Sequence, residues 1–131
     1  MSKSTFFPTL KKRREFMRLQ KEGSKWITPA FVIQSAPFEG LEKRVGYITT
    51  RKLGSAVVRN KARRRLKEII RSVFPEHALP GYDYVVLARS SCTTCNFLSL
   101  KKDMIWSLGH LHRVQKQNID QEIEKHDDAE T

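Results

Sequence analysis

The sequence predicts a single α/β domain whose elements follow the order helix, strand, strand, short strand, helix, strand, helix. The chain has 131 residues, a length that suits one domain with one core. Apolar residues recur at helical spacing in three segments, and β-rich runs lie between those segments. The hydrophobic fraction of 39% is low but clustered, so a folded core is expected.

The first predicted helix spans residues 10–22. Thr9 is a suitable N-cap and Gly23 a suitable C-terminal stop, and residues 1–8 before them are expected to be flexible. The helix is also strongly basic. Its cations are Lys11, Lys12, Arg13, Arg14 and Arg18.

The apolar residues of this helix do not form one stripe. Leu10 and Met17 share a face, whereas Phe16 and Leu19 point elsewhere. The helix therefore either packs against two apolar neighbours or exposes an aromatic side chain.

A β-rich run at residues 26–33 predicts the first strand, with Pro29 near its start, where a strand tolerates proline. The segments that follow are a polar turn at 37–43, a strand at 44–50, a loop at 51–55 and a short strand or helix lead-in at 56–58.

The strongest signal is a basic helix that starts near Asn60, a good N-cap, and is expected to end at Pro75. Residues 59–71 contain seven Lys or Arg and only Glu68 as an acid. With an advance of 100° per residue, four apolar positions lie within about 40° of one another around the helix axis. This apolar stripe comprises Ala62, Leu66, Ile69 and Val73. The opposite side carries Arg63, Arg64, Lys67 and Arg71. The apolar stripe anchors the helix in the core, and the cations form a rigid outward row.

Residues 82–88 predict a buried strand, and a last helix begins after Asn96 or Thr94 as its cap. Its apolar stripe comprises Phe97, Leu100, Met104, Leu108 and Leu111. Residues 115–131 are polar and rich in acids, and we expect them to be disordered or a frayed extension of this helix. The predicted folded domain is then residues 9–114.

The net charge of +11 points to a polyanionic partner, because a compact body this basic repels itself unless it is neutralised. The acids gather after residue 115, so the body is more basic than the whole chain. Nucleic acid is the first candidate partner and an anionic membrane the second. Basic clusters beside the aromatics Phe16, Trp26 and Phe31 suit single-stranded RNA, although core packing is the ordinary explanation for any one aromatic.

Other chemistries find little support in the sequence. Cys92 and Cys95 lack suitable zinc partners, because His110 and His112 would point apart on a helix, so a local turn is the expected role of this pair. The acids of the body are scattered singly, with no pair typical of a two-metal nuclease. No metal site or catalytic residue is predicted in the protein. No apolar run reaches the ~18 residues of a membrane span and no secretory signal is present, so a cytoplasmic location is expected.

A longer motif resembles a known family. Residues 49–64 read TTRKLGSAVVRNKARR, which is similar to the pattern of the protein subunit of bacterial ribonuclease P. Further similarity lies at residues 12–16 and 83–89, and the resemblance spans about residues 9–112.

The resemblance implies an αβββαβα sandwich, like a domain of some ribosomal proteins, with a left-handed βαβ crossover around the basic helix. It also implies partnership with a catalytic RNA and with the 5′ leader of precursor tRNA, which the RNA removes with Mg²⁺ to leave the mature 5′ end. Mg²⁺ is then held mainly by RNA and substrate, and no obligate protein partner or membrane is expected.

Site residues follow from the resemblance together with the basic surface. The predicted RNA-binding residues are Arg51, Lys52, Arg59, Asn60, Lys61, Arg63, Arg64, Lys67 and Arg71. The predicted leader-binding cleft comprises Lys12, Arg13, Phe16, Phe31 and Arg89. Gln20 departs from the family pattern, in which a second aromatic is common, and Arg63 replaces a lysine, which binds phosphate with a different geometry.

Two rival functions remain at this stage. A ribosomal or chaperone-like RNA-binding protein would show the same basic surface, and only the long motif argues against it. A stand-alone protein nuclease is disfavoured by the missing carboxylate pair.

Overall fold

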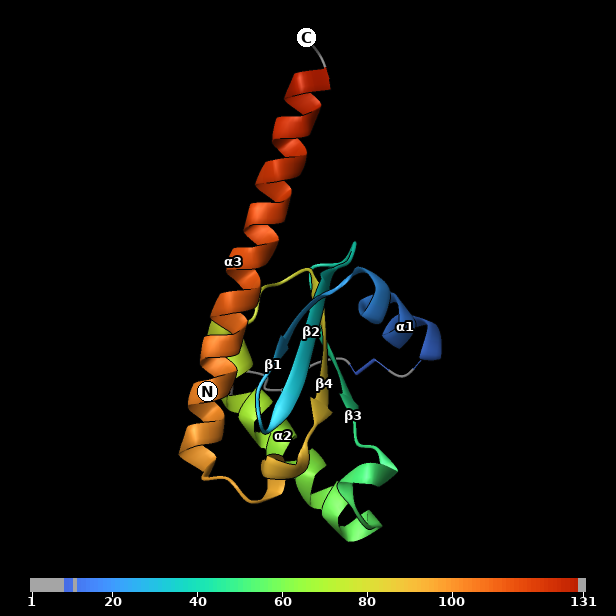
Figure 1. Cartoon of the computed structure of the whole chain (residues 1–131), viewed down its shortest axis with the longest axis vertical. Helices are drawn as coiled ribbons and strands as arrows, with labels where there is room; N and C mark the ends of the chain where they lie inside the picture. The colour runs from blue at the N-terminus through green and yellow to red at the C-terminus, as the bar shows by residue number, and fades with distance from the viewer. Residues whose placement is uncertain (1–8, 11, 130–131) are drawn as a thin grey trace.

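The computed structural model describes residues 9–10 and 12–129, with side chains described up to residue 114. A four-stranded mixed sheet, of order β1-β2-β4-β3, has helices on both faces (Figure 1). The strands are β1 (Ser24–Ile27), β2 (Phe31–Pro37), β3 (Lys43–Ile48) and β4 (Tyr82–Ala88). The long helices are α1 (Arg13–Glu22), α2 (Ala56–His77) and α3 (Phe97–Ala129), with short 3₁₀ turns η1 (Arg51–Leu53) and η2 (Ser90–Thr93). The predicted α/β class and the αβββαβα order are confirmed.

Strand pairing explains the topology. β2 pairs antiparallel with both β1 and β4, whereas β3 and β4 are parallel and are joined through α2. This βαβ unit is the crossover whose left hand the family resemblance implies, and that hand stays a prediction. The outer edge of β3 is covered at one point by the segment before α1, where the Leu10 N–H donates to the Val45 carbonyl at 3.0 Å.

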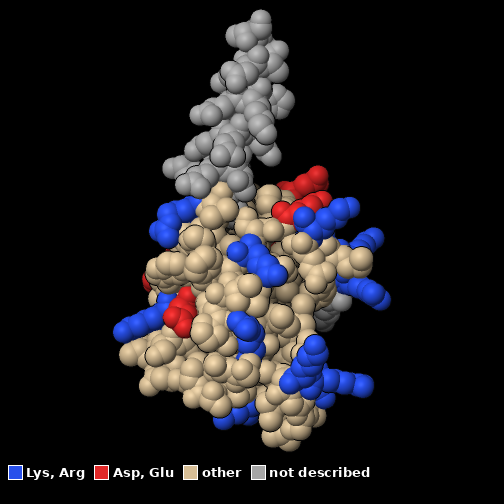
Figure 2. Space-filling view, in the orientation of Figure 1, with Lys and Arg blue, Asp and Glu red and all other residues tan. Residues whose placement is uncertain are grey.

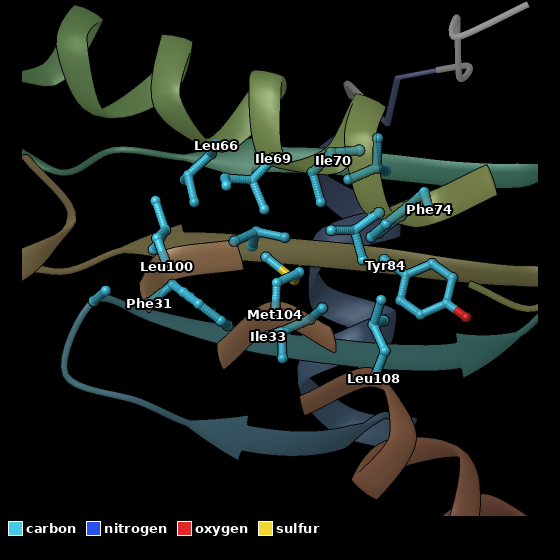
Figure 3. Close-up of a cluster of buried hydrophobic side chains, with 14 of the residues drawn as sticks. Phe31, Ile33, Leu66, Ile69, Ile70, Phe74, Tyr84, Leu100, Met104 and Leu108 are labelled. Carbon is cyan, nitrogen blue, oxygen red and sulfur yellow. The ribbon is translucent and has the colours of Figure 1, made fainter. Parts of the chain in front are cut away.

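The core lies between the sheet and the helices α2 and α3 (Figure 3). Alternate residues of β2 and β4, among them Phe31, Ile33 and Tyr84, point into it and are fully buried. The predicted stripes supply the helical side. The stripe residues buried here are Ala62, Leu66, Ile69 and Val73 from α2 and Leu100, Met104, Leu108 and Leu111 from α3. Burial of these residues confirms the anchoring role expected of the two stripes. Phe97, the first predicted member of the α3 stripe, is an exception, because it is 39% exposed.

The predicted single strand at residues 26–33 is wrong, because a tight hairpin divides it into β1 and β2. The Thr28 hydroxyl accepts a hydrogen bond from the Phe31 N–H at 3.0 Å, and the Thr28 N–H donates to the Phe31 carbonyl at 2.8 Å. Pro29 lies in this turn, where its missing N–H costs no ladder hydrogen bond.

Helix α2 begins and ends outside its predicted limits. Ser55 is the N-cap, since its hydroxyl accepts from the Val58 N–H, and Asn60 lies inside the helix. Residues 56–58 are thus the first turn of α2 and not a strand. Pro75 lies within the last turn, and the Lys43 ammonium donates to the Phe74 and Pro75 carbonyls at 3.0 and 3.1 Å. These bonds satisfy carbonyls that lack partners at a helix C-terminus.

The buried face of α1 also differs from the prediction. α1 begins at Arg13, so Leu10 precedes it, and Met17 is 55% exposed. Leu19 is fully buried and Phe16 packs beside it, in a second apolar cluster on the sheet face opposite α2 and α3. The predicted Thr9 cap is therefore wrong. The N-terminal turn is closed instead by the Glu15 carboxylate, which accepts from the Lys12 N–H at 3.3 Å.

Helix α3 starts as predicted, with the Asn96 side-chain oxygen accepting from the Leu98 N–H at 2.8 Å. Its helical backbone continues to Ala129, through the segment for which disorder or a frayed extension of this helix was expected, and its last turns project beyond the other elements (Figure 1). The predicted flexible segment, residues 1–8, lies outside the described residues. None of the helices in the described part of the chain is long and apolar enough to cross a membrane.

Candidate nucleic-acid interface

The outward face of α2 presents a row of cations with the neutral amide of Asn60 beside them. We call this surface the α2 cationic face and define it by Asn60, Arg63, Arg64, Lys67 and Arg71. Of these, Asn60, Arg64, Lys67 and Arg71 are exposed. A hollow of about 470 Å³ on the helix surface is lined by Val57, Asn60, Arg63, Arg64 and Lys67. Because the other face of α2 is locked in the core, the cations stand on a rigid support.

Neighbouring groups hold two of these cations in place. The Arg63 guanidinium donates to the Thr49 hydroxyl at 2.8 Å and to the Asn60 side-chain oxygen at 3.2 Å, so it is pre-oriented and half-buried. The Lys67 ammonium lies 5.8 Å from the centre of the Tyr47 ring, within reach of a cation–π contact. Burial raises the pKa of Tyr47 to about 12, so its hydroxyl stays neutral at physiological pH.

The remaining predicted RNA-binding residues extend this surface toward the start of α2. Arg51 and Lys52 lie exposed on η1, and Lys61 is exposed on α2. Arg59 is half-buried, and its Nε is buried with no hydrogen-bond partner among the described residues. Gly54 sits between η1 and α2 at φ 145°, a region that favours glycine, so the approach to the helix requires this residue.

Arg65, next in sequence to Arg64, has a different role. Its guanidinium donates to the Thr93 carbonyl at 3.0 Å and to the Cys95 carbonyl at 2.7 Å. It therefore ties α2 to the segment that leads into α3, and its charge is turned away from the exposed row.

A second feature is a groove of about 300 Å³ on the sheet face that α1 only partly covers. We call it the sheet groove. Its lining residues are Gln20, Lys25, Ile27, Val32, Gln34, Ile48, Val85, Leu87 and Arg89. The floor is apolar and the rim carries amides and two cations, a combination that suits unstacked bases joined by phosphates. Arg89 is positioned by a hydrogen bond of 2.8 Å to the Thr28 carbonyl.

Only part of the predicted cleft lies at this groove. Arg89 lines it, and Lys12 and Arg13 are exposed at the start of α1. Phe16 is half-buried against Gly46 and does not line the groove itself, although it packs against the same apolar cluster as the groove residue Ile48. Phe31 was wrongly placed in the cleft, because it is fully buried in the core on the other face of the sheet. Successive strand residues point to opposite faces, so its neighbour Val32 lines the groove instead.

Most of the groove lining was missed by the sequence analysis. Val32, Gln34, Val85 and Leu87 alternate with core residues along β2 and β4, and that alternation was the available signal. The sequence does not say which sheet face a helix covers, so the alternation alone would not have distinguished a groove from a second core.

A buried carboxylate holds α1 against the sheet. Asp83 is fully buried and is bound by Arg44, with Nε–Oδ1 at 2.6 Å and Nη2–Oδ2 at 2.7 Å, and by the Arg18 guanidinium. The hydrogen bonds to Asp83 raise the pKa of Arg44 further above its ordinary value. Arg18 also donates to the Pro37 carbonyl at 2.8 Å. This network fixes the helix that carries Gln20, one wall of the groove.

The residues that the structure describes do not form a metal site. No group of three or more His, Cys, Asp or Glu that could hold a metal ion occurs among the described residues. The Asp83 carboxylate binds the guanidiniums of Arg18 and Arg44. The Glu15 carboxylate lies 3.5 Å from the Arg44 guanidinium. Cys92 is buried, its thiol lies 3.8 Å from the Ala62 carbonyl, and burial raises its pKa to about 11, so it is an unreactive core thiol. Cys95 lies in the turn that Arg65 binds, consistent with the local role expected of this pair.

Comparison with known proteins places these features in a family. A sequence model of the family described as Ribonuclease P matches residues 7–112, which include both the α2 cationic face and the sheet groove. The chain belongs to the ribonuclease P protein family. The resemblance drawn from residues 49–64 is thereby confirmed, and the protein subunit of ribonuclease P is the role it takes. The family match ends before the projecting part of α3.

Individual relatives agree with this family assignment. The Ribonuclease P protein component of Paramagnetospirillum magneticum is 38% identical over 112 residues, covering 82% of this chain and 84% of the relative. The solved RNase P protein from Thermotoga maritima superposes with a TM-score of 0.67 at 28% identity, covering 80% of this chain and 96% of that one. The Staphylococcus aureus RNase P protein gives a TM-score of 0.64 at 28% identity, covering 82% and 94%.

Proposed function

We propose that this ribonuclease P protein binds the catalytic RNA through the α2 cationic face and the single-stranded 5′ leader of precursor tRNA in the sheet groove. The observation that carries the proposal is the row of exposed cations on α2, whose opposite face is locked in the core. Rigid cations on one face match a fixed array of phosphates at little entropic cost.

The chemistry of leader removal is assigned to the RNA. The described carboxylates are scattered or engaged by arginines, and they form no donor set for Mg²⁺ within the described part of the chain. Mg²⁺ is held by the RNA and the substrate, where it supplies the charge stabilisation for phosphodiester cleavage. The protein contributes by neutralising phosphates and by holding the leader, which lowers the Mg²⁺ concentration that the reaction needs. We place this activity in the cytoplasm.

The decisive experiment compares precursor-tRNA cleavage by the catalytic RNA alone, by the protein alone, and by both together at low Mg²⁺. We expect efficient cleavage at the mature 5′ end only with both components. Cleavage by nuclease-treated, RNA-free protein at that position would overturn the assignment of the active site. Equal rates for the RNA with and without protein would overturn the accessory role.

The groove part of the proposal is tested by Lys25→Ala, because Lys25 is an exposed cation on the groove rim. This variant should weaken holoenzyme binding of precursor tRNA and leave the affinity for mature tRNA, which has no leader, unchanged. Lys21→Ala removes an exposed lysine of α1 that does not line the groove and is the matched control. Equal losses for precursor and mature tRNA would remove the leader from the groove.

A further inference from the structure

An aromatic cluster seals the edge of the sheet where β1 meets α3. The Trp26 ring lies 4.9 Å from the Trp106 ring and 4.0 Å from the His110 ring, measured between centroids. The rings of Trp106 and His110, one helical turn apart on α3, are nearly parallel at 6° with centroids 5.4 Å apart. Trp106 is therefore held in a defined orientation by two ring neighbours.

Despite these contacts Trp106 is 54% exposed, which is unusual for the largest apolar side chain. Neither the α2 cationic face nor the sheet groove includes it. Sealing the sheet edge accounts for the contacts of Trp26, but it does not account for the large remaining surface of Trp106.

The residues around Trp106 on α3 form one outward stripe, which we call the α3 platform. At 100° per residue its members lie within about 80° of one another on the helix. They are Leu98, Lys102, Trp106, Gly109 and Arg113. Four of them are exposed, and a side chain added at Gly109 would meet nothing within 4 Å, so the surface beside the indole is open.

We propose that the α3 platform is a second binding site for single-stranded RNA, in which a base stacks on Trp106 and the cations Lys102 and Arg113 contact the flanking phosphates. Aromatic rings flanked by cations are the usual means by which proteins hold unpaired nucleotides, because every base has a stackable face. The site lies on the helix that packs against the opposite face of the sheet from the groove, so it is separate from the proposed leader site.

Charge favours RNA over a second copy of this chain as the occupant. The chain carries a net charge of +11, so two copies would repel each other across this stripe. Figure 2 shows basic side chains spread over this view of the molecule with few acidic ones among them. The apolar part of the platform is also small, since Leu98 and Trp106 are separated by Lys102 along the stripe.

The chain provides its own reporter for this site. It has two tryptophans, Trp26 and Trp106, and both belong to the cluster, so all of its tryptophan fluorescence arises there. A base stacked on Trp106 should quench this emission. We therefore expect quenching when the full chain is titrated with a short single-stranded oligouridylate, whose total binding is followed in parallel by the anisotropy of a terminal label.

Two substitutions at position 106 form a matched pair, because Trp26 remains as the sole reporter in each. Trp106→Phe retains a stacking surface and should keep most of the affinity. Trp106→Ala should raise the oligonucleotide concentration needed for half-maximal quenching by about 5- to 150-fold. Oligonucleotide binding detected by anisotropy without any quenching of the wild type would overturn the proposal, and so would equal midpoints for the two variants.

The cations are tested separately, which keeps the proposal falsifiable if Trp106→Ala unfolds the sheet edge. The double variant Lys102→Ala, Arg113→Ala should lower the salt dependence of platform binding, log K against log salt, by about 1.4, since each single-strand phosphate contributes about 0.7. Lys21→Ala, on the far side of the sheet, should leave it unchanged. An unchanged slope in the double variant would overturn the proposal.

The rival occupant has its own signature. Self-association in sedimentation that Trp106→Ala abolishes would assign the stripe to a second copy and overturn the RNA site. Failure of the platform would leave the proposed ribonuclease P function untouched, because precursor-tRNA cleavage with the catalytic RNA measures that function independently.

Discussion

The guanidinium of Arg44 binds the fully buried carboxylate of Asp83 through two hydrogen bonds, Nε–Oδ1 at 2.6 Å and Nη2–Oδ2 at 2.7 Å. Paired bonds of this kind are directional as well as strong. With the Arg18 guanidinium on the same carboxylate, they connect α1, β3 and β4 at one point. A single acid on β4 thus sets the position of the helix that forms one wall of the groove.

Asp83→Asn should destabilise the domain. The amide removes the charge that two guanidiniums neutralise and leaves them facing a buried group that cannot accept their bonds equally. We expect a loss of about 3 kcal/mol in the free energy of unfolding, the low end for a broken buried pair, because both arginines are partly exposed. Urea unfolding measures it, and Asp103→Asn on the exposed side of α3 is the control. A loss below about 0.5 kcal/mol would show that the network does not hold α1.

Adjacent arginines of α2 should respond oppositely to truncation. Arg64→Ala removes an exposed cation, so it should weaken RNA binding and flatten its salt dependence while the melting temperature stays close to that of the wild type. Arg65→Ala removes the bonds to Thr93 and Cys95, so it should lower the melting temperature and leave the salt dependence of binding unchanged. The two are compared by thermal unfolding and by binding to the catalytic RNA at several salt concentrations. The same effect from both variants would contradict the division of roles.

Phe16 and Gly46 should be coupled, because a Cβ built at Gly46 would lie 2.8 Å from the Phe16 ring. Gly46→Ala should cost about 1–3 kcal/mol through this overlap. In a Phe16→Ala background the cost should fall, although Leu10 Cβ, 3.2 Å from the added carbon, still limits the space. A double-mutant cycle on the free energy of unfolding measures the coupling. Strictly additive costs would mean that Phe16 does not rest on β3 in solution.

The free energy of unfolding should decrease as the pH is lowered, because His112 is half-buried in its neutral form. Its Nε2 lies 3.1 Å from the Tyr84 hydroxyl, and that hydroxyl accepts a hydrogen bond from the Leu79 N–H. Burial, followed by the charge of His77, lowers the pKa of His112 below its ordinary 6.5. The unfolded chain therefore takes up a proton at higher pH than the folded chain does. Stability contributed by neutral His112 is present above the ordinary pKa and is lost as pH falls below it.

His112→Gln should therefore reduce the loss of unfolding free energy between about pH 7 and pH 5, since glutamine does not titrate. Denaturant unfolding across this range, for wild type and variant, is the measurement. Parallel pH profiles for the two proteins would remove His112 from the acid response.

Residues with a strong local period were read correctly from the sequence. The apolar stripes of α2 and α3 and the strand Tyr82–Ala88 were predicted at the right places, because each depends on a repeat within one segment. The exposed cations Arg64, Lys67 and Arg71 of α2 follow from the same repeat, since residues opposite the buried stripe face outward. The motif at residues 49–64 led from there to the family.

Relationships between distant segments were not available in this way. Phe31 and Val32 are equally apolar neighbours, yet one fills the core and the other lines the groove, because α2 and α3 cover one sheet face and α1 covers only part of the other. In the sequence Asp83 is one of several scattered acids, and only the folded structure shows that it pairs with Arg18 and Arg44.

The sequence by itself therefore determined the helices α2 and α3, their buried stripes, the charged face of α2, and the family, because these depend on spacing along the chain. The tertiary structure alone decided which sheet face became a groove, which arginines are exposed and which are engaged, and that Trp106 stands on an open surface. Those outcomes depend on contacts between segments far apart in sequence, and a period within one segment carries no information about what packs against it.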